Sequence, residues 1–257
     1  MISLDGLHQF AVQTAYQAGI ITLGYFNQAI QIDYKLDNSP VTAADKAAEN
    51  FIRAEIENRF PSHTILGEEF GLKNDLSSTF RWIIDPIDGT KSFMRGVPMY
   101  GVLIGLEVEG EIKVGAAYFP GTDEMLSAYE GGGAWINGRR AITSDKADLG
   151  QAYVCYTNVL NMEAQSRSRE WQALSRKVFT VRGWGDAYGH MLVATGRAEV
   201  MLDPIMNVWD CGPFPVILKE ANGYFGSWDG REGHLHHEAI SCSNTLVRDV
   251  LEVFRSA

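Results

Sequence analysis

One short segment constrains this chain more than any other part: residues 82–93, which read WIIDPIDGTKSF. Its first half is apolar and β-branched, so it predicts a buried strand. The strand has to stop at Asp85-Pro86, because proline cannot donate to a sheet ladder and restrains the residue before it. A second carboxylate, Asp88, follows within one turn, just before the start of a short predicted helix.

These residue types favour a particular chemistry. Two carboxylates at the carboxyl end of a strand contribute little to stability, but hard cations prefer oxygen ligands. The next residues, Gly89 and Thr90, would offer helix N-terminal N–H groups to an anion. The segment therefore predicts a metal and a phosphate group at one place. The alternative, which a bare D-x-x-D pattern favours, is an ordinary Asp-Pro turn followed by an aspartate helix cap.

The charge balance adds an electrostatic requirement. The chain has 22 Lys and Arg against 32 Asp and Glu, a formal net charge of −10. This balance argues against general nucleic-acid binding, which needs basic patches. The negative charge would also repel a phosphate ester unless cations bind first. A metal site would offset this repulsion.

Cysteine usage and the N-terminal residues bear on the compartment. Cys155, Cys211 and Cys242 are odd in number and far apart, with no C-x-x-C pair, which predicts reduced thiols and argues against a zinc site. Residues 1–30 lack a basic start followed by a long apolar core, and no apolar run is long enough to span a bilayer. We therefore expect a cytoplasmic protein without membrane contact.

Hydrophobic periodicity predicts two halves of mixed α and β structure. Residues 1–142 should form an α+β half, with two helices against a sheet, and residues 143–257 an α/β half. The predicted strands lie at 30–35, 63–66, 82–84, 101–108, 112–119, 125–129, 134–136, 140–142, 153–156, 179–182, 198–202 and 239–241. The predicted helices lie at 4–28, 42–59, 163–177, 186–195, 209–221 (ended by Gly223) and 246–254.

A cluster of histidines offers a second candidate metal site. His234, His236 and His237 lie in one short loop, and such a cluster can bind a transition metal. No carboxylate or cysteine stands at a matching short spacing, so a surface loop is the favoured interpretation.

Three segments together resemble a known family. The string DPIDGT after an apolar strand, with Phe93 three residues on, resembles the signature of the inositol monophosphatase-like family of metal-dependent, lithium-sensitive phosphatases. ILGEE at 65–69 is similar to the family's upstream Gly-Glu-Glu, and NVWDCGP at 207–213 to its downstream Trp-Asp. The order is the family's and the resemblance covers nearly the whole chain. It implies the layered α-β-α-β-α sandwich that the family shares with the sugar bisphosphatases.

The resemblance implies a metal site for two or three Mg²⁺ ions and inhibition by lithium. A weakly held third ion would lie near Glu68, and Asp85 would bridge the other two. The implied oxygen ligands are Glu68, Asp85, the main-chain carbonyl of Ile87, Asp88 and Asp210.

It also implies catalysis by a metal-activated water, with Thr90, Asp45 and Glu68 as the catalytic residues. Thr90 would orient the water and Asp45 would accept its proton, while N–H groups of Gly89 and Thr90 cradle the phosphate. From the residues alone, Asp45 has another role, because Thr42 and Asp45 have the spacing of a capping box. The two roles are compatible.

The organic part of the substrate would be recognised by the second half. Arg182, Trp184 and Asp186 stand where the family contacts its leaving group, and Asp203 matches another specificity position. Two acids and an indole suit an amine and a flat, partly cationic ring. The segments 91–98 and 183–204 also resemble the histidinol-phosphatase branch more than the inositol branch. The alternative is that Trp184 is core and Asp186 caps the following helix.

The sequence thus predicts a cytoplasmic, Mg²⁺-dependent phosphomonoesterase that hydrolyses L-histidinol phosphate to L-histidinol and phosphate, late in histidine biosynthesis. Inositol-1-monophosphatase and a broad sugar-phosphate or nucleotide phosphatase are the alternatives. A regulatory binding protein of the same fold is an alternative of another class. The expected partner is a small-molecule phosphate ester, with no nucleic acid and no membrane, and the family precedent is a homodimer.

Overall fold

The computed structural model describes residues 3–28, 32–34, 40–73 and 78–257. Its helices are α1 (Leu4–Leu23), α2 (Ala43–Arg59), α3 (Thr90–Met94), α4 (Val159–Ala164), α5 (Ser168–Ser175), α6 (Asp186–Ala194), α7 (Val208–Cys211), α8 (Phe214–Glu220) and α9 (Val247–Arg255), with a 3₁₀ turn at Leu149–Gln151. Within these ranges, no helix combines the length and the apolar composition that crossing a bilayer requires.

The strands fall into a large and a smaller sheet, beside a short β1–β2 pair. They are β1 (Ile32–Tyr34), β2 (Pro40–Thr42), β3 (Thr64–Gly67), β4 (Gly71–Lys73), β5 (Phe80–Asp88), β6 (Gly101–Val108), β7 (Glu111–Phe119), β8 (Glu124–Tyr129), β9 (Gly133–Ile136), β10 (Arg139–Arg140), β11 (Tyr153–Tyr156), β12 (Thr180–Arg182), β13 (Val200–Asp203), β14 (Gly223–Gly226) and β15 (Ala239–Ser243).

The large sheet is covered by helices on both faces. Its order is β10-β9-β8-β7-β6-β5-β3-β4, antiparallel except where β3 runs parallel to β5. Side chains alternate across β5: Trp82 and Ile84 pack with α1 and α2, whereas Ile83 packs with the helices on the other face. A central strand that is apolar on both sides is what this two-sided covering requires.

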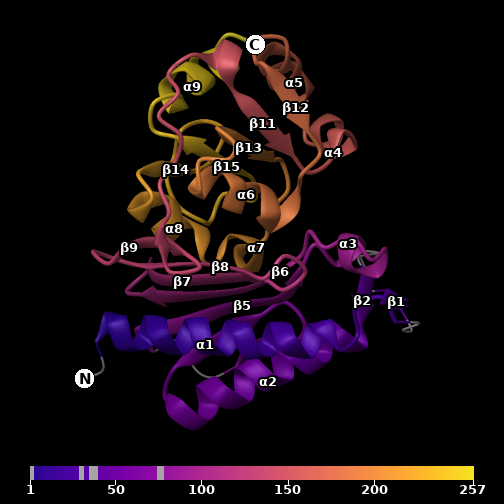
Figure 1. Cartoon of the computed structure of the whole chain (residues 1–257), viewed down its shortest axis with the longest axis vertical. Helices are drawn as coiled ribbons and strands as arrows, with labels where there is room; N and C mark the ends of the chain where they lie inside the picture. The colour runs from indigo at the N-terminus through magenta and orange to yellow at the C-terminus, as the bar shows by residue number, and fades with distance from the viewer. Residues whose placement is uncertain (1–2, 29–31, 35–39, 74–77) are drawn as a thin grey trace.

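The smaller sheet has the order β12-β11-β13-β15-β14, and α5 and α9 cover its outer face. Its strands β12, β11 and β13 are parallel, so their carboxyl ends meet at one edge. From bottom to top in Figure 1 the layers are α1 with α2, the large sheet, the central helices, the smaller sheet, and α5 with α9. The predicted α-β-α-β-α sandwich is confirmed.

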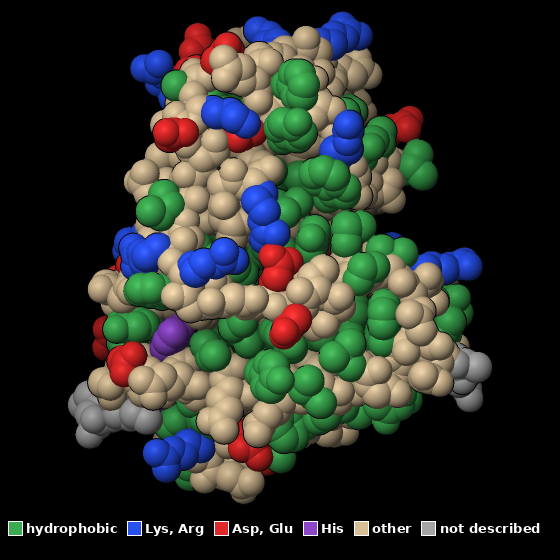
Figure 2. Space-filling model, in the orientation of Figure 1, with side chains coloured by type: hydrophobic (Ala, Val, Ile, Leu, Met, Phe, Trp, Pro, Cys, Tyr) green, Lys and Arg blue, Asp and Glu red, His purple; other side chains and the backbone are tan. Residues whose placement is uncertain are grey.

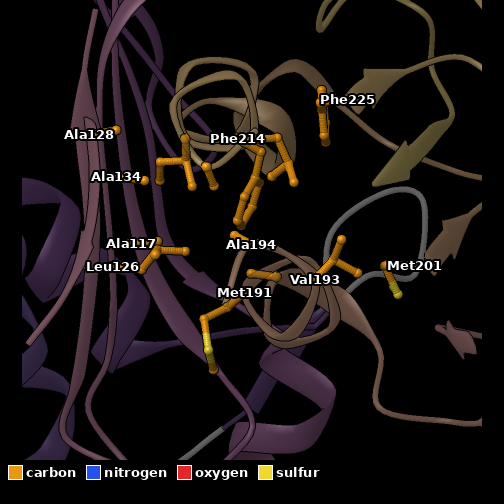
Figure 3. Close-up of a cluster of buried hydrophobic side chains, with 14 of the residues drawn as sticks. Ala117, Leu126, Ala128, Ala134, Met191, Val193, Ala194, Met201, Phe214 and Phe225 are labelled. Carbon is orange, nitrogen blue, oxygen red and sulfur yellow. The ribbon is translucent and has the colours of Figure 1, made fainter. Parts of the chain in front are cut away.

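The two halves share one apolar core. Figure 3 shows Ala117 and Leu126 on the large sheet facing Met191 of α6 and Phe214 of α8, and all four side chains are buried in a single cluster. Because this cluster is drawn from both sheets and the helices between them, unfolding either half would expose apolar surface of the other. The boundary at residue 142 stays a prediction.

Two paired glycines let the second half approach the large sheet closely. Gly105 of β6 and Gly115 of β7 are direct partners in the ladder. A Cβ on Gly105 would lie 2.3 Å from the carbonyl oxygen of Gly212, and one on Gly115 would lie 2.4 Å from that of Pro213. The link between α7 and α8 therefore lies directly on the sheet, which fixes the position of α7.

We expect Gly105→Ala to destabilise the protein by about 1–3 kcal/mol, because the added methyl group overpacks a backbone contact. Activity should fall as well, since α7 would have to move. Chemical denaturation and a phosphatase assay would measure both effects. Gly150→Ala is the matched control, because its Cβ would come no closer than 3.2 Å, to the side chain of Asp148 in an exposed turn. Wild-type stability and activity in Gly105→Ala would contradict this account of the interface.

The helix predicted at 163–177 is divided, because two short helices, α4 and α5, occupy this part. The first begins at Val159, where the side chain of Asn158 accepts the N–H of Leu160 at 2.9 Å. The chain then passes through Ser166, whose φ of 59° is left-handed and cannot continue a right-handed helix.

The helix predicted at 209–221 is also divided, into α7 and α8. Pro213 lies between them, and it has no N–H with which to continue the ladder of the preceding turn. The left-handed residue that ends α8 is Asn222, with a φ of 61°, rather than the predicted Gly223. Gly223 instead opens β14, a strand that was not predicted.

Smaller differences lie at the edges. α1 ends at Leu23 rather than at residue 28. The strand predicted at 30–35 is described only over Ile32–Tyr34, and its ends lie outside the described residues. The unpredicted β4 is a three-residue edge strand, too short to show a period in the sequence.

The prediction that the histidine cluster forms a surface loop is wrong for His234. Its side chain is buried, with Nε2 3.2 Å from Oε2 of Glu107, and Arg81 donates to the same carboxylate oxygen at 2.5 Å. The loop is thereby tied to β5 and β6. Among these histidines His237 is exposed, as predicted.

The three cysteines agree with the prediction of reduced thiols. Cys155, Cys211 and Cys242 are unpaired and buried. Burial raises the pKa of each thiol above its ordinary value, which favours the protonated form.

Candidate active site

The carboxyl end of β5 presents two carboxylates on one side. Asp85 pairs with Leu103 and Asp88 with Gly101, so the register shifts by one residue between them. The Asp85 side chain is 1% exposed, and its Oδ1 accepts the N–H of Ile87 at 3.0 Å. This irregularity changes the direction in which side chains point at the end of the strand, as bulges near functional sites commonly do.

A third carboxylate comes from the other half. Asp210 lies in α7, which packs against β5 and β6. Its Oδ2 accepts two hydrogen bonds from Asn207, from the main-chain N–H at 2.7 Å and from Nδ2 at 3.3 Å. One oxygen each of Asp85, Asp88 and Asp210 then lie within 4.8 Å of one another. Asn207 was not singled out from the sequence, although it stands three residues before Asp210, the spacing of a capping box.

The cluster is electrostatically unfavourable on its own. Burial, and then the neighbouring carboxylates, raise the pKa values of Asp85 and Asp88 well above the ordinary range. Burial raises the pKa of Asp210 to about 7. Asp85 is buried and Asp88 and Asp210 are partly buried, and carboxylate oxygens that repel each other as anions are the donor set that a hard divalent cation satisfies. These residues therefore fit the predicted metal.

Glu68 and Asp45 flank the cluster. Glu68 follows β3, its main-chain N–H donates to the carbonyl of Ile84 at 3.2 Å, and its charge contributes to the raised pKa of Asp85. Asp45 forms the predicted capping box: its Oδ2 accepts the N–H of Thr42 at 2.8 Å and the Thr42 hydroxyl at 2.5 Å.

The other oxygen of Asp45 is available for chemistry. Oδ1 is buried and accepts no hydrogen bond from any residue in the described ranges. Burial raises the pKa of this carboxyl to about 6, and the charge of Glu68 adds to the shift. A buried acceptor without a partner is costly in a native protein, so a functional use is the natural explanation. Both roles given to Asp45 by the sequence are thus geometrically compatible.

Gly89 and Thr90 connect β5 to α3. Gly89 has a φ of 86°, a conformation that favours glycine, and no side chain caps the first turn that follows it. The Thr90 hydroxyl donates to the carbonyl oxygen of Ile87 at 3.0 Å. The predicted nucleophile-orienting group and the predicted main-chain ligand are therefore in direct contact.

Asp186 reaches this connection from the second half. Its Oδ2 lies 3.4 Å from the position that a Cβ on Gly89 would occupy. Its carboxylate makes no hydrogen bond or ion pair within the described part of the chain. Burial raises its pKa, and the charge of Lys91 opposes this shift in part. The next main-chain N–H, of Ala187, donates to Oδ2 of Asp88. Asp186 thus lies beside the predicted phosphate cradle with its carboxylate unengaged.

The other predicted specificity residues differ from Asp186 in their hydrogen bonds and exposure. Asp203 is 4% exposed, and both its oxygens are occupied: Oδ2 by the Thr157 hydroxyl at 2.6 Å and Oδ1 by the N–H of Ile205 at 3.3 Å. Burial raises its pKa to about 8. Trp184 is 36% exposed rather than core.

Arg182 is not brought to the carboxylate cluster. Its exposed guanidinium donates to Oγ1 of Thr180 at 2.6 Å and to the carbonyl of Val181 at 2.8 Å, within its own strand. The side chain instead turns back along β12.

Thr157 was missed from the sequence. It directly follows β11, and Asp203 ends the parallel neighbour β13. The carboxyl ends of parallel strands are where ligand-binding residues collect, so its position was a usable signal once both strands were predicted.

Comparisons with known proteins identify relatives of this chain in sequence and in fold. A sequence model of the inositol monophosphatase family matches residues 3–255. A histidinol-phosphatase of Chlorobaculum parvum is 41% identical over 245 residues, covering 95% of this chain and 94% of that protein. One of Streptomyces coelicolor is 34% identical over 231 residues, covering 86% of each. The crystal structure of extragenic suppressor protein SuhB from Bartonella henselae superimposes with a TM-score of 0.91 at 25% identity, covering 98% of this chain and 99% of that one.

Proposed function

The chain belongs to the inositol monophosphatase family, and on this premise we propose that it hydrolyses L-histidinol phosphate to L-histidinol and inorganic phosphate. It is a phosphoric monoester hydrolase, and its substrates are small-molecule phosphate esters. The finer assignment, to the late part of histidine biosynthesis, is supported by the relatives that are named histidinol-phosphatases.

The observation that carries the proposal is the position of Asp186. Histidinol phosphate bears an ammonium group two bonds from the ester carbon, so a phosphate held at Gly89 and Thr90 would bring that ammonium close to the cradle. The Asp186 carboxylate lies there without a partner of its own in the described residues. An inositol ring, which offers only neutral hydroxyls at this place, would leave the carboxylate's charge unpaired.

The remaining carboxylates are assigned to Mg²⁺. Two or three ions would be held by Glu68, Asp85, the carbonyl of Ile87, Asp88 and Asp210. When bound, the metal would neutralise charge on the phosphate and lower the pKa of a coordinated water. Inhibition by lithium and a homodimeric state remain predictions from the family.

The chain's own groups complete the site. N–H groups of Gly89 and Thr90 would hold the phosphate oxygens, and the Thr90 hydroxyl would orient the attacking water. Oδ1 of Asp45, buried and without a hydrogen-bond partner among the described residues, would take the proton. Trp184, partly exposed at the amino end of α6, would offer a flat surface to the imidazole ring.

We expect Asp186→Asn to lower kcat/KM for histidinol phosphate by about 10- to 150-fold, since a charge-assisted hydrogen bond contributes roughly 1.5–3 kcal/mol. Hydrolysis of glycerol phosphate, which has no ammonium, should hardly change. Steady-state assays of both esters with Mg²⁺ would measure the ratio, and Asp249→Asn, at a partly exposed position of α9, is the matched control. Equal losses on both esters would mean that Asp186 serves the fold or the metals instead.

A panel of phosphate esters tests the proposal as a whole. Histidinol phosphate should have the highest kcat/KM, above inositol-1-phosphate, sugar phosphates and nucleotides. A preference for inositol-1-phosphate would replace the proposal with the inositol-1-monophosphatase alternative, and a flat profile would indicate a broad phosphatase. A regulatory binding protein would instead show no turnover of any ester.

A further inference from the structure

One threonine connects the two acids of the second half. Thr157 follows β11, and its hydroxyl donates to Oδ2 of Asp203 at 2.6 Å. The oxygen of the Thr157 hydroxyl itself accepts the main-chain N–H of Asp186 at 3.1 Å. Because a hydroxyl has a single proton, directing that proton at Asp203 leaves the lone pairs of the oxygen to receive the Asp186 N–H.

The turn that carries Asp186 is held in an uncommon shape. Asp186 has a φ of 55°, in the left-handed region that residues with a side chain rarely adopt. Directly before it, a Cβ on Gly185 would lie 2.6 Å from Cα of Thr157, so the two segments touch through their backbones. Directly after it, Ala187 donates its N–H to Asp88. Such a conformation persists only where its surroundings hold it on several sides.

We infer that Thr157 is a positioning residue for substrate selection, which holds the Asp186 turn so that the Asp186 carboxylate faces the phosphate cradle. This inference rests on the proposed function and adds a part to it. Asp203 acts one step further back: buried, with both oxygens engaged, it orients the Thr157 hydroxyl and does not touch the substrate.

This arrangement explains why two acids stand at the end of the smaller sheet although one ammonium needs only one of them. Asp186 is the unengaged acid beside Gly89, while Asp203 is the occupied acid behind Thr157. The hydrogen-bond chain Asp203–Thr157–Asp186 extends from the carboxyl end of β13, past that of β11, to the first residue of α6. Substrate choice is therefore fixed by the packing of the second half as well as by the residue that contacts the substrate.

The test compares Thr157→Val, which keeps the shape but removes the hydroxyl, with Thr157→Ser, which keeps the hydroxyl. Thr157→Val should lower kcat/KM for histidinol phosphate about tenfold, the effect of losing one hydrogen bond. Its kcat/KM for glycerol phosphate should change less than about threefold, because the hydrogen bonds of Thr157 go to Asp203 and Asp186 and not to the phosphate cradle or the carboxylate cluster. Thr157→Ser should restore most of the lost selectivity.

Asp186→Asn, assayed beside these variants, separates the inference from the function on which it rests. If Asp186→Asn loses selectivity and Thr157→Val keeps it, the inference is overturned and the proposed function stands. If Thr157→Val loses both esters equally and serine restores neither, Thr157 has only a structural role and the inference is again overturned.

A crystal structure of Thr157→Val provides a readout that needs no substrate. The Asp186 turn should leave the left-handed region or its carboxylate should move away from Gly89. An unchanged turn would overturn the inference even if the wild-type enzyme proves to prefer another ester. Thermal unfolding of each variant would confirm that a selectivity change does not arise from a loss of fold.

Discussion

Replacing Asp85 by asparagine is expected to lower kcat/KM by about 10³-fold or more for every ester, since a metal ion supplies several kcal/mol of transition-state stabilisation. Asp85 is 1% exposed and lies among Glu68, Asp88 and Asp210, so it is the central donor of the cluster. Titration with Mg²⁺ should show a higher half-saturating concentration. Chelation of the wild-type enzyme should abolish activity, and added Mg²⁺ should restore it.

The metal-free protein offers a second measurement on Asp85→Asn. A raised pKa means that folding disfavours the charged carboxylate, so the wild-type stability contributed by Asp85 should fall as pH rises above the ordinary value of 3.8. Asparagine cannot ionise, and the variant should unfold at a higher temperature than wild type at neutral pH without metal. Asp249→Asn, at a partly exposed position of α9 where the side chain pairs with Arg248, should change neither property. Full activity of Asp85→Asn would remove the basis for the metal assignment.

The carboxylate cluster was predictable because its residues stand in short sequence motifs that resemble those of the family. Asp85 and Asp88 stand on the same strand end, although β5 does not stop at Asp85-Pro86 as predicted but continues past Pro86 to Asp88 through a register shift of one residue. Glu68 and Asp210 follow their own short motifs in the expected order. The sandwich was predicted from the family resemblance, and the apolar strand at residues 82–84 agrees with it because such a strand has to be covered on both faces.

The orientation of side chains in the second half was much less predictable. Arg182 and Asp186 are four residues apart in one motif, yet Arg182 turns back along its strand while Asp186 faces the site. The difference depends on the left-handed turn at Asp186. This turn is held by contacts with Thr157, which follows a strand distant in sequence. His234 differs from its prediction for a related reason, because its partner Glu107 is 127 residues away in sequence. Contacts of this kind leave no periodic signal.

The role of Thr90 can be separated from a purely structural one. Its hydroxyl donates to the carbonyl of Ile87 at 3.0 Å, so it could orient a water or merely hold the turn between β5 and α3. These roles differ in which quantity they change. A hydroxyl that orients the water acts on the transition state and sets kcat, whereas one that holds the Ile87 carbonyl acts on metal binding.

We therefore expect Thr90→Ala to lower kcat by ~10²–10⁴-fold with little change in KM, the range found for groups that assist proton transfer from a nucleophile. The half-saturating Mg²⁺ concentration should stay near the wild-type value. Thr90→Ser should retain much of the rate, because it keeps the hydroxyl. A loss of less than about threefold, far below that range, would reduce Thr90 to a structural residue of the turn. A large rise in the Mg²⁺ requirement with unchanged kcat at saturation would instead show that its hydroxyl serves the Ile87 carbonyl.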